Sequence, residues 1–406
     1  METVFFAKWI LLENGEILTN GAISVVGNKI NSIGLRSKVR RSSSVRVINL
    51  GDCLVLPGLI NLHTHLEESV IRGIQKDPDE TFATWSIKKD ARVKLISQQT
   101  LHTSIKLTAR ELLAEGITTV VDCSKTPLSG TILSDESIRS KIIHEISLDD
   151  FLQEKNSFDS YLQRIAICSS TIGLSPSTLQ SLPLEAHKQL RDFVLDKNLL
   201  WATHLAESAE ELQAFSEHSG DLFFHTTRRQ PWPFEKTPFG PVDFALNNNL
   251  IPDGGICFHC NYINGSELDR LAAKKASIVH CHTYTEELGH KMFPLDAARN
   301  RNLSICIGTE GIAAPGKMSL FDELFSLKCA YPHIPALEML RWVTINPAVA
   351  LKMENQLGSL TPGKYADIIA VRFAHNPQED LLEELLVEEP EIVLVMVDGE
   401  EVIVGY

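Results

Sequence analysis

The sequence lacks any apolar run approaching the ~20 residues needed to cross a bilayer, so no membrane association is expected. It also lacks an excess of basic residues: 38 Lys and Arg stand against 52 Asp and Glu, a formal net charge of −14. Because an acidic surface repels phosphate backbones, we do not expect a nucleic-acid partner. Residues Met1 to Lys8 lack the charged-then-apolar order of a secretory signal, so we expect a cytoplasmic protein.

Cysteine is present but follows no disulfide pattern. The eight cysteines are scattered and most lie within apolar runs, which is typical of buried thiols in a reducing compartment. Cys257 and Cys260 have CxxC spacing, yet no second pair follows at zinc-finger spacing, so we interpret both as structural. With 406 residues, 44% of them hydrophobic, the chain can bury the cores of one large α/β domain and a smaller one.

Both ends of the chain are β-rich. In residues 1–55, apolar runs are separated by the hairpin signals Asn14-Gly15, Asn20-Gly21 and Gly27-Asn28. Near the other end, strand-like runs occupy residues 366–371, 391–397 and 401–404. Neither piece is long enough for a core of its own. We therefore expect a small β-sandwich domain built from residues 1–55 plus 351–406.

Between these ends, short apolar runs alternate with helical stretches. Repeated βα units imply a parallel sheet, and eight of them fit a closed (β/α)8 TIM-like barrel. The fold class expected is therefore α/β, with a barrel of residues 56–350 and insertions at 74–99 and 220–255. The eight expected strands are residues 54–62, 117–123, 142–146, 164–167, 200–204, 256–259, 277–280 and 303–308.

Histidines and carboxylates gather at the predicted ends of these strands. In His63-Thr64-His65, which ends the first strand, alternate residues point to the same side, so both imidazoles can reach one ion. Barrel enzymes build their sites where strands run into the following loops. The polar residues at or just beyond the predicted strand ends are His63, His65, His204, Glu207, His259, His280, His282 and Glu310.

Such a set has the ligands for metal chemistry. Three histidines and a carboxylate can hold one divalent ion and leave a position open for water. A bound ion would lower the pKa of that water toward ~7. Glu207, three residues beyond His204, is placed to move the proton from water to the leaving group. His259 is placed to hold the water or to stabilise a developing oxyanion.

The chain resembles the amidohydrolase superfamily, in the branch of adenosine-type and cytosine-type deaminases and chlorohydrolases. The order and spacing of the matching motifs hold over nearly the whole chain. The resemblance implies a metal-bearing barrel and a β-sandwich made from both termini. The motifs are residues 57–65, 115–122, 204–208, 279–281, 307–311 and 358–367.

Carried over to this sequence, the resemblance implies that His63, His65 and His204 are metal ligands. It also implies that Glu207 carries protons and that His259 orients water. No lysine lies in residues 164–170, which argues against the binuclear members of the superfamily. One divalent metal ion is therefore expected as cofactor, with Zn favoured and Fe or Mn as alternatives.

Finer features are similar to the aminofutalosine (aminodeoxyfutalosine) deaminases of an alternative menaquinone pathway. They are His65-Leu66-Glu67 followed by Arg72-Gly73, then residues 82–85 and 237–242. This similarity implies substrate roles for Glu67 and Arg72. Glu67 either binds a ribose hydroxyl or supports a ligand imidazole. Arg72 either binds a substrate carboxylate or ribose, or forms a structural salt bridge.

Three departures from the family pattern bear on the site. Glu310 stands where the family has an aspartate, and it either ligates the metal or only orients the water. Residues 168–171 offer hydroxyls in place of a proline-histidine pair, and residues 282–285 replace the proline and asparagine that usually follow His280-Cys281. His280 is expected to contact substrate rather than metal. The substrate-facing residues have therefore changed more than the water-activating ones.

The function expected is hydrolytic deamination of a 6-aminopurine nucleoside-like small molecule, with aminofutalosine as one candidate substrate. Two alternatives stay open. One is a chlorohydrolase or amidase that acts on another cyclic substrate. The other is a catalytically degenerate barrel that binds a ligand without turnover, because fold alone does not establish activity. The sequence permits a homo-oligomer and does not define the oligomeric state.

Overall fold

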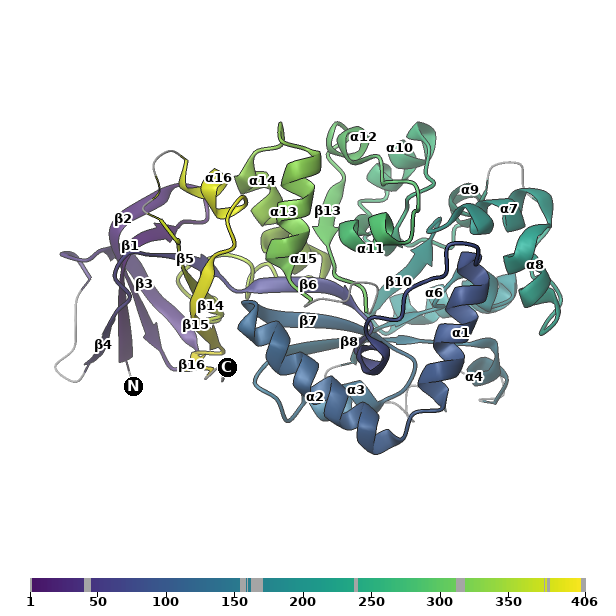
Figure 1. Cartoon of the computed structure of the whole chain (residues 1–406), viewed down its shortest axis with the longest axis horizontal. Helices are drawn as coiled ribbons and strands as arrows, with labels where there is room; N and C mark the ends of the chain where they lie inside the picture. Colours follow the sequence, from purple (N-terminus) through teal and green to yellow (C-terminus); the bar gives the residue numbers. More distant parts are fainter. Residues whose placement is uncertain are drawn as a thin grey trace.

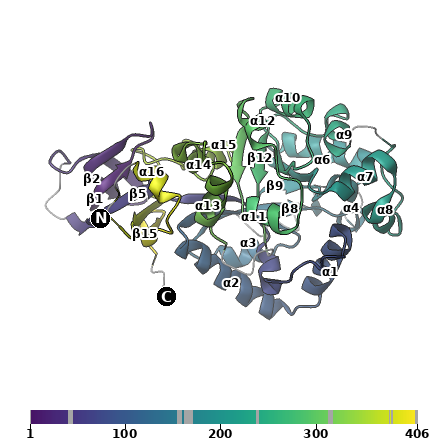
Figure 2. The same cartoon turned by 45° about the horizontal axis from the view of Figure 1, so that its top comes forward.

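The computed structural model describes residues 2–39, 45–153, 158, 160–161, 171–236, 240–311, 318–375, 377 and 380–402. Two sheets lie beside each other in Figure 1, with a β-rich end on the left and a helix-covered barrel on the right. Both ends of the chain reach the β-rich part, as the turned view in Figure 2 also shows. The predicted fold, a (β/α)8 barrel with a small β unit from both termini, is confirmed.

The terminal sheet is mixed and joins strands from both ends of the chain. Its order is β16-β15-β14-β5-β1-β2-β3, with β4 also paired to β1. The two ends meet where β5 and β14 pair in antiparallel fashion, with Leu56 opposite Ile369. Its strands are β1 (Glu2–Leu11), β2 (Ile17–Val26), β3 (Lys29–Leu35), β4 (Val45–Asn49), β5 (Cys53–Pro57), β14 (Ile368–Arg372), β15 (Glu391–Val397) and β16 (Glu400–Glu401).

One of the three predicted hairpin signals is wrong. Asn14-Gly15 and Gly27-Asn28 do connect paired strands, but Asn20-Gly21 lies inside β2. Asn20 has a φ of 51° there, which asparagine tolerates better than most residues. A Cβ on Gly21 would lie 2.4 Å from Cδ1 of Ile10, so this glycine allows close packing of β1 against β2.

The barrel is an eight-stranded parallel sheet in which each strand pairs with the next along the chain. It closes between its first and last strands, where the Glu310 amide donates a 3.1 Å hydrogen bond to the His63 carbonyl. A parallel bridge between Thr64 and Glu310 marks the same seam. The strands are β6 (Leu59–Thr64), β7 (Ile117–Ser124), β8 (Arg139–Glu145), β9 (Thr171–Ser175), β10 (Leu200–Leu205), β11 (Ile256–His259), β12 (Ser277–His280) and β13 (Ser304–Ile307).

Helices cover the outside of the barrel (Figure 1). None of those in the described ranges is both long enough and apolar enough to cross a membrane. The helices are α1 (Phe82–Lys94), α2 (Gln98–Ala114), α3 (Leu128–Leu133), α4 (Leu148–Gln153), α6 (Leu184–Asp196), α7 (Ala209–Glu217), α8 (Gly220–Thr227), α9 (Pro241–Asn247), α10 (Gly265–Ala273), α11 (His282–Glu287), α12 (Leu295–Arg299), α13 (Leu320–Ala330), α14 (Ala336–Arg341), α15 (Ile345–Ala350) and α16 (Leu381–Leu385).

The prediction of one first strand over residues 54–62 is wrong. The run contains two strands, β5 of the terminal sheet and β6 of the barrel, with Gly58 alone between them. Both strands are fully buried, so no polar residue marks the boundary. Gly58 donates a 2.9 Å hydrogen bond from its amide to the Asp367 carbonyl. A Cβ at Gly58 would lie 2.1 Å from Oγ1 of the buried Thr118.

The fourth barrel strand is also misplaced in the prediction. The expected run, residues 164–167, lies outside the described residues, and the strand that pairs with β8 and β10 is β9. β9 is short and carries Gly173, which weakens the apolar β signal. That glycine is needed because a Cβ would lie 2.7 Å from the Leu200 carbonyl oxygen. β9 contains no lysine.

We predict that Gly58→Ala destabilises the fold by about 1–3 kcal/mol, because the added methyl group overpacks against Thr118. The midpoint of chemical unfolding measures this change. Gly34→Ala is the matched control: Gly34 also lies in a strand, and its Cβ would come no closer than 3.8 Å to Val39. Equal stability of the two variants would contradict this account of the junction.

Candidate active site

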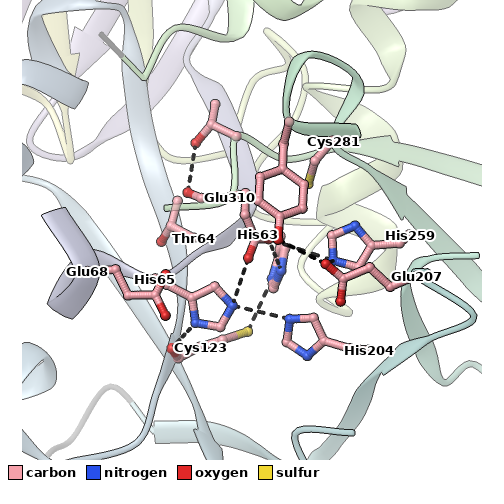
Figure 3. Close-up of polar contacts among 12 residues, drawn as sticks. His63, Thr64, His65, Glu68, Cys123, His204, Glu207, His259, Cys281 and Glu310 are labelled. Atoms are coloured by element: carbon pink, nitrogen blue, oxygen red, sulfur yellow. Dashed lines mark hydrogen bonds and ion pairs between the residues drawn. The ribbon is translucent and has the colours of Figure 1, made fainter. Parts of the chain in front are cut away.

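Imidazole and carboxylate side chains from distant parts of the chain meet at the carboxyl ends of the barrel strands. His63 and His65 come from β6 and the residue after it, His204 from β10, His259 from β11, and Glu310 from just beyond β13. Figure 3 shows their side chains pointing toward one another. All five are buried. The predicted convergence of these strand ends is therefore present in the structure.

The backbone leaves its strands under strain at two of these positions. His259 and Glu310 have φ values of 67° and 56°, which residues with a side chain rarely adopt. Such strain, worth of order 1–3 kcal/mol at each residue, persists where the surroundings enforce it and often accompanies a functional site. At Glu310, the strained turn aims the carboxylate back over β6, where it meets both histidines of the His63-Thr64-His65 motif.

The distances are compatible with a single metal ion. One oxygen of Glu310 lies 2.6 Å from Nε2 of His63, and the other lies 3.3 Å from Nε2 of His65. The Nε2 atoms of His65 and His204 are 3.2 Å apart. One ligand atom each from His63, His204, His259 and Glu310 lies within 4.8 Å of the others.

Several atoms of this cluster are buried without a hydrogen bond among the described residues. They are Nε2 of His63, both ring nitrogens of His259 and one carboxylate oxygen of Glu310. Each such atom costs about 1–3 kcal/mol unless something else satisfies it. Imidazole nitrogen and carboxylate oxygen are ligands that suit a divalent transition metal. These side-chain donors therefore fit a metal cation.

Backbone carbonyls fix which ring nitrogen of two histidines faces the cluster. Nδ1 of His65 lies 2.9 Å from the Cys123 carbonyl oxygen, and Nδ1 of His204 lies 2.9 Å from that of Ser177. A carbonyl only accepts hydrogen bonds, so Nδ1 carries the proton in both rings and the Nε2 lone pair faces the cluster. The His63 ring is held by stacking on Phe258, with a centroid distance of 3.8 Å.

The protonation states favour a cation as well. Burial lowers the pKa of His65 and of His259 well below the usual value for histidine. Burial works to raise the pKa of Glu310, but the neighbouring histidines, His63 foremost, hold it well below its usual value. Neutral His65 and His259 rings and an ionised Glu310 are the forms that bind metal. At His204, burial works to lower the pKa of the ring, but nearby carboxylates, Glu145 foremost, raise it.

Glu207 lies at the edge of this cluster on the turn after β10. Its Oε1 is 3.8 Å from Nε2 of His259 and accepts a 2.9 Å hydrogen bond from the Tyr284 hydroxyl. Its backbone is held on both sides, since its amide donates to Glu211 and its carbonyl accepts from Asn261. The predicted proton carrier thus lies next to the predicted water-orienting histidine, in a fixed position.

Glu67 and Arg72, the two substrate contacts expected after the first strand, already have partners. The Glu67 carboxylate accepts hydrogen bonds from the hydroxyls of Ser124 and Thr126, at 2.7 and 2.5 Å. Arg72 forms a 2.7 Å ion pair with Glu111 on α2, which corresponds to the salt-bridge alternative. The substrate roles of both residues stay predictions.

His280 lies beside His282 rather than within the cluster. Nε2 of His280 is 3.2 Å from Nδ1 of His282, and both rings are buried. Burial and the neighbouring His282 lower the pKa of His280, so it is neutral. Its predicted contact with substrate stays a prediction.

The other two expected substrate features, residues 168–170 and 237–239, lie outside the described residues.

Two residues of the site were missed in the sequence. Glu145, at the end of β8, lies 3.5 Å from Nδ1 of His204, and its carboxylate oxygens have no hydrogen-bond partner among the described residues. The strand-end rule could have found it, because the expected third strand, residues 142–146, contains it. Tyr284 stands in the first turn of α11 and has no comparable signal. Burial and the nearby Glu207 raise its pKa, which keeps the phenol protonated.

Helix α1, from the predicted insertion at 74–99, is fixed close to the site. The Glu210 carboxylate accepts hydrogen bonds from the amides of Phe82 and Ala83, at 2.6 and 2.8 Å, and so caps its first turn. On its inner face, Lys89 forms a buried 2.8 Å ion pair with Glu68, which follows the His63-Thr64-His65 motif.

Comparison with known proteins identifies the family. The model of the amidohydrolase family matches residues 54–402, and the chain belongs to this family. A relative from Pyrococcus horikoshii named 5-methylthioadenosine/S-adenosylhomocysteine deaminase is 25% identical, over 92% of this chain and 90% of its own. The predicted amidohydrolase enzyme is therefore confirmed at the level of the family.

Solved structures share the fold. The aminofutalosine deaminase of Helicobacter pylori, in complex with methylthio-coformycin, has a TM-score of 0.84 and 19% identity, covering 99% of this chain and 100% of that one. An adenosine deaminase from Xanthomonas campestris with bound zinc has a TM-score of 0.81 and 18% identity, covering 98% and 92%. At these identities the likeness shows the architecture alone.

We predict that Lys89→Met destabilises the protein by about 3–5 kcal/mol, because it leaves the buried Glu68 carboxylate without a counter-charge. Lys88→Met is the control, since Lys88 is the adjacent residue of α1 and its side chain is 57% exposed in its pair with Glu80. That change is expected to cost at most about 1 kcal/mol. Denaturant unfolding measures both, and equal losses would show that the buried pair does not anchor α1.

Proposed function

We propose that the protein is a metal-dependent deaminase that hydrolyses the exocyclic amino group of a 6-aminopurine nucleoside-like substrate. The observation that carries the proposal is the buried meeting of His63, His65 and His204 with Glu310. His259 also lies within ligand reach of His63, His204 and Glu310, and Glu207 lies 3.8 Å from His259. The names of the relatives support the substrate class: a 5-methylthioadenosine/S-adenosylhomocysteine deaminase and an aminofutalosine deaminase.

His63, His65, His204 and Glu310 would hold one divalent ion, and zinc is the metal we propose. His259 lies further from Glu310 than His63 and His65 do, with 3.8 Å between Nε2 and a carboxylate oxygen. A bound cation of this kind supplies Lewis-acid chemistry and makes water a stronger acid. Imidazole and carboxylate ligands support zinc, as does its presence in the Xanthomonas campestris structure.

Glu207 would act as the proton carrier. Its carboxylate takes a proton from the attacking water and passes it to the adjacent ring nitrogen, while the new C–O bond forms at the amino-bearing carbon. Glu207 then moves the proton of the newly added hydroxyl group to the amino group. The C–N bond breaks as that oxygen forms the C=O bond, and ammonia leaves. The fixed backbone of Glu207 supports this role, because proton transfer requires hydrogen-bond reach to both groups.

His259 would orient the water and stabilise the tetrahedral intermediate. Its ring is fully buried and neither nitrogen has a hydrogen bond among the described residues, which supports a role for the ring in binding a reactant. Its position 3.8 Å from Glu207 puts the donor and the base on the same side of the site. A preorganised donor of this kind needs little rearrangement during the reaction.

The particular nucleoside is the finer part of the proposal. Aminofutalosine and 5′-methylthioadenosine are the leading candidates, the first from the sequence features near Glu67 and Arg72, the second from the Pyrococcus horikoshii relative. A chlorohydrolase or amidase would use the same water chemistry on another leaving group. A ligand-binding barrel without turnover would need neither a full complement of metal nor Glu207.

We predict that purified protein contains about one equivalent of metal and releases ammonia from at least one adenine nucleoside in a panel. The panel includes adenosine, 5′-methylthioadenosine, S-adenosylhomocysteine and aminofutalosine, with a chlorinated triazine as the alternative leaving group. Chelation is expected to abolish turnover and added zinc to restore it, because the buried donors need the cation. Substoichiometric metal and no turnover would instead support the ligand-binding alternative.

We predict that Glu207→Gln lowers kcat by about 10²–10⁴-fold, because the amide cannot accept and return the proton. Its metal content is expected to match that of wild type. Glu217→Gln is the control, since Glu217 ends α7 after Glu207 in the chain and lies on the surface. A Glu207→Gln protein that kept its metal and its wild-type rate would exclude this residue as the proton carrier.

A further inference from the structure

Tyr284 makes the only side-chain hydrogen bond that the described residues give to the Glu207 carboxylate. Its hydroxyl donates to Oε1 at 2.9 Å, and no described residue donates to Oε2. The same oxygen lies 3.8 Å from Nε2 of His259, which is too long for a hydrogen bond. The phenol therefore determines which oxygen of Glu207 is engaged and which one stays available.

The tyrosine is itself held firmly at both ends. Its ring is 3% exposed, packs in one apolar cluster with Ile71 and Trp85, and lies 5.6 Å from the His259 ring. Its backbone belongs to the first turn of α11, where the Glu323 carboxylate accepts hydrogen bonds from the amides of His282 and Thr283. A carboxylate on free amides fixes the start of a helix, and so the origin of the Tyr284 side chain.

We propose that Tyr284 is a positioning residue for the deamination reaction, which orients the Glu207 carboxylate so that Oε2 transfers the proton. The inference deepens the proposed function and rests on it. Tyr284 belongs to residues 282–285, which stand where the family pattern has proline and asparagine after His280-Cys281. The phenol gives the proton carrier a fixed orientation through its hydrogen bond to Oε1.

A purely structural role would give a different result when the hydroxyl is removed. Tyr284→Phe keeps the ring, its packing with Trp85 and its position near His259, and deletes only the donor. Loss of packing is therefore not expected, whereas Glu207 loses the group that fixes its orientation. Small displacements of a catalytic group can cost large factors in rate, because reaction requires aligned atoms.

The first test compares Tyr284→Phe with wild type. We expect kcat to fall by roughly 10- to 100-fold, with KM and metal content little changed. Tyr365→Phe is the matched control, because it removes a tyrosine hydroxyl near Arg139 in contact with the terminal sheet, where no change in kcat is expected. Wild-type kcat in Tyr284→Phe would overturn the proposal, as would a loss explained wholly by metal loss.

A double-mutant cycle separates action through Glu207 from an independent effect. In the Glu207→Gln background, Tyr284→Phe is expected to have almost no further effect on the residual rate, since the group it positions is already disabled. A second loss equal to the loss in the wild-type background would overturn the positioning role. The cycle is measured with the best nucleoside of the panel.

A structural readout keeps this inference separate from the proposed function. In a crystal structure of Tyr284→Phe, we expect the Glu207 carboxylate to adopt a rotamer different from that of wild type, or more than one. An unchanged single rotamer would overturn the positioning role even in an active deaminase. Conversely, absence of ammonia release by wild type would refute the proposed function while the rotamer still reports on Tyr284.

Discussion

The hydrogen bond from the Glu310 amide to the His63 carbonyl joins the first and last strands of the barrel. The same residue that closes the sheet turns its carboxylate onto His63 and His65. Gly308 allows this approach, since a Cβ there would lie 2.7 Å from the Cβ of His63. Glu310 therefore takes part both in closing the barrel and in forming the cluster.

The glutamate side chain of residue 310 is accommodated in the histidine cluster. A glutamate in place of the family's aspartate reaches further, and the strained backbone of Glu310, with a φ of 56°, turns its carboxylate into the cluster. Both carboxylate oxygens lie near histidine nitrogens, at 2.6 and 3.3 Å. A carboxylate therefore still lies beside the histidines, although glutamate stands where the family has aspartate.

Much of this arrangement could be predicted, because parallel strands deliver their last residues to one edge. That rule brought His63, His204 and Glu310 together from positions far apart in the sequence. The prediction of strand positions failed in two places. At β9, a glycine breaks the apolar run, so the strand was not recognised. At Gly58, two buried strands follow each other without a polar residue between them, so they were predicted as one strand. The roles of the gathered residues stay predictions, since geometry alone does not test chemistry.

Other contacts had no sequence signal to follow. Tyr284 reaches Glu207 from the first turn of α11, and the pairing of Lys89 with Glu68 depends on where α1 lies in three dimensions. Such contacts arise from the placement of inserted segments, which periodicity does not encode.

Only one residue, Gly58, separates β5 of the terminal sheet from β6 of the barrel, so the chain passes directly from one sheet into the other. The strand that carries His63 begins one residue after a strand of the terminal sheet, and the Gly58 amide is tied to Asp367 near the other end of the chain. Arg139, at the start of β8, adds a two-pronged ion pair to the same aspartate. The terminal sheet thus holds the start of the strand that carries His63, and a barrel excised without it would lose the contacts of Gly58 and Arg139 with Asp367.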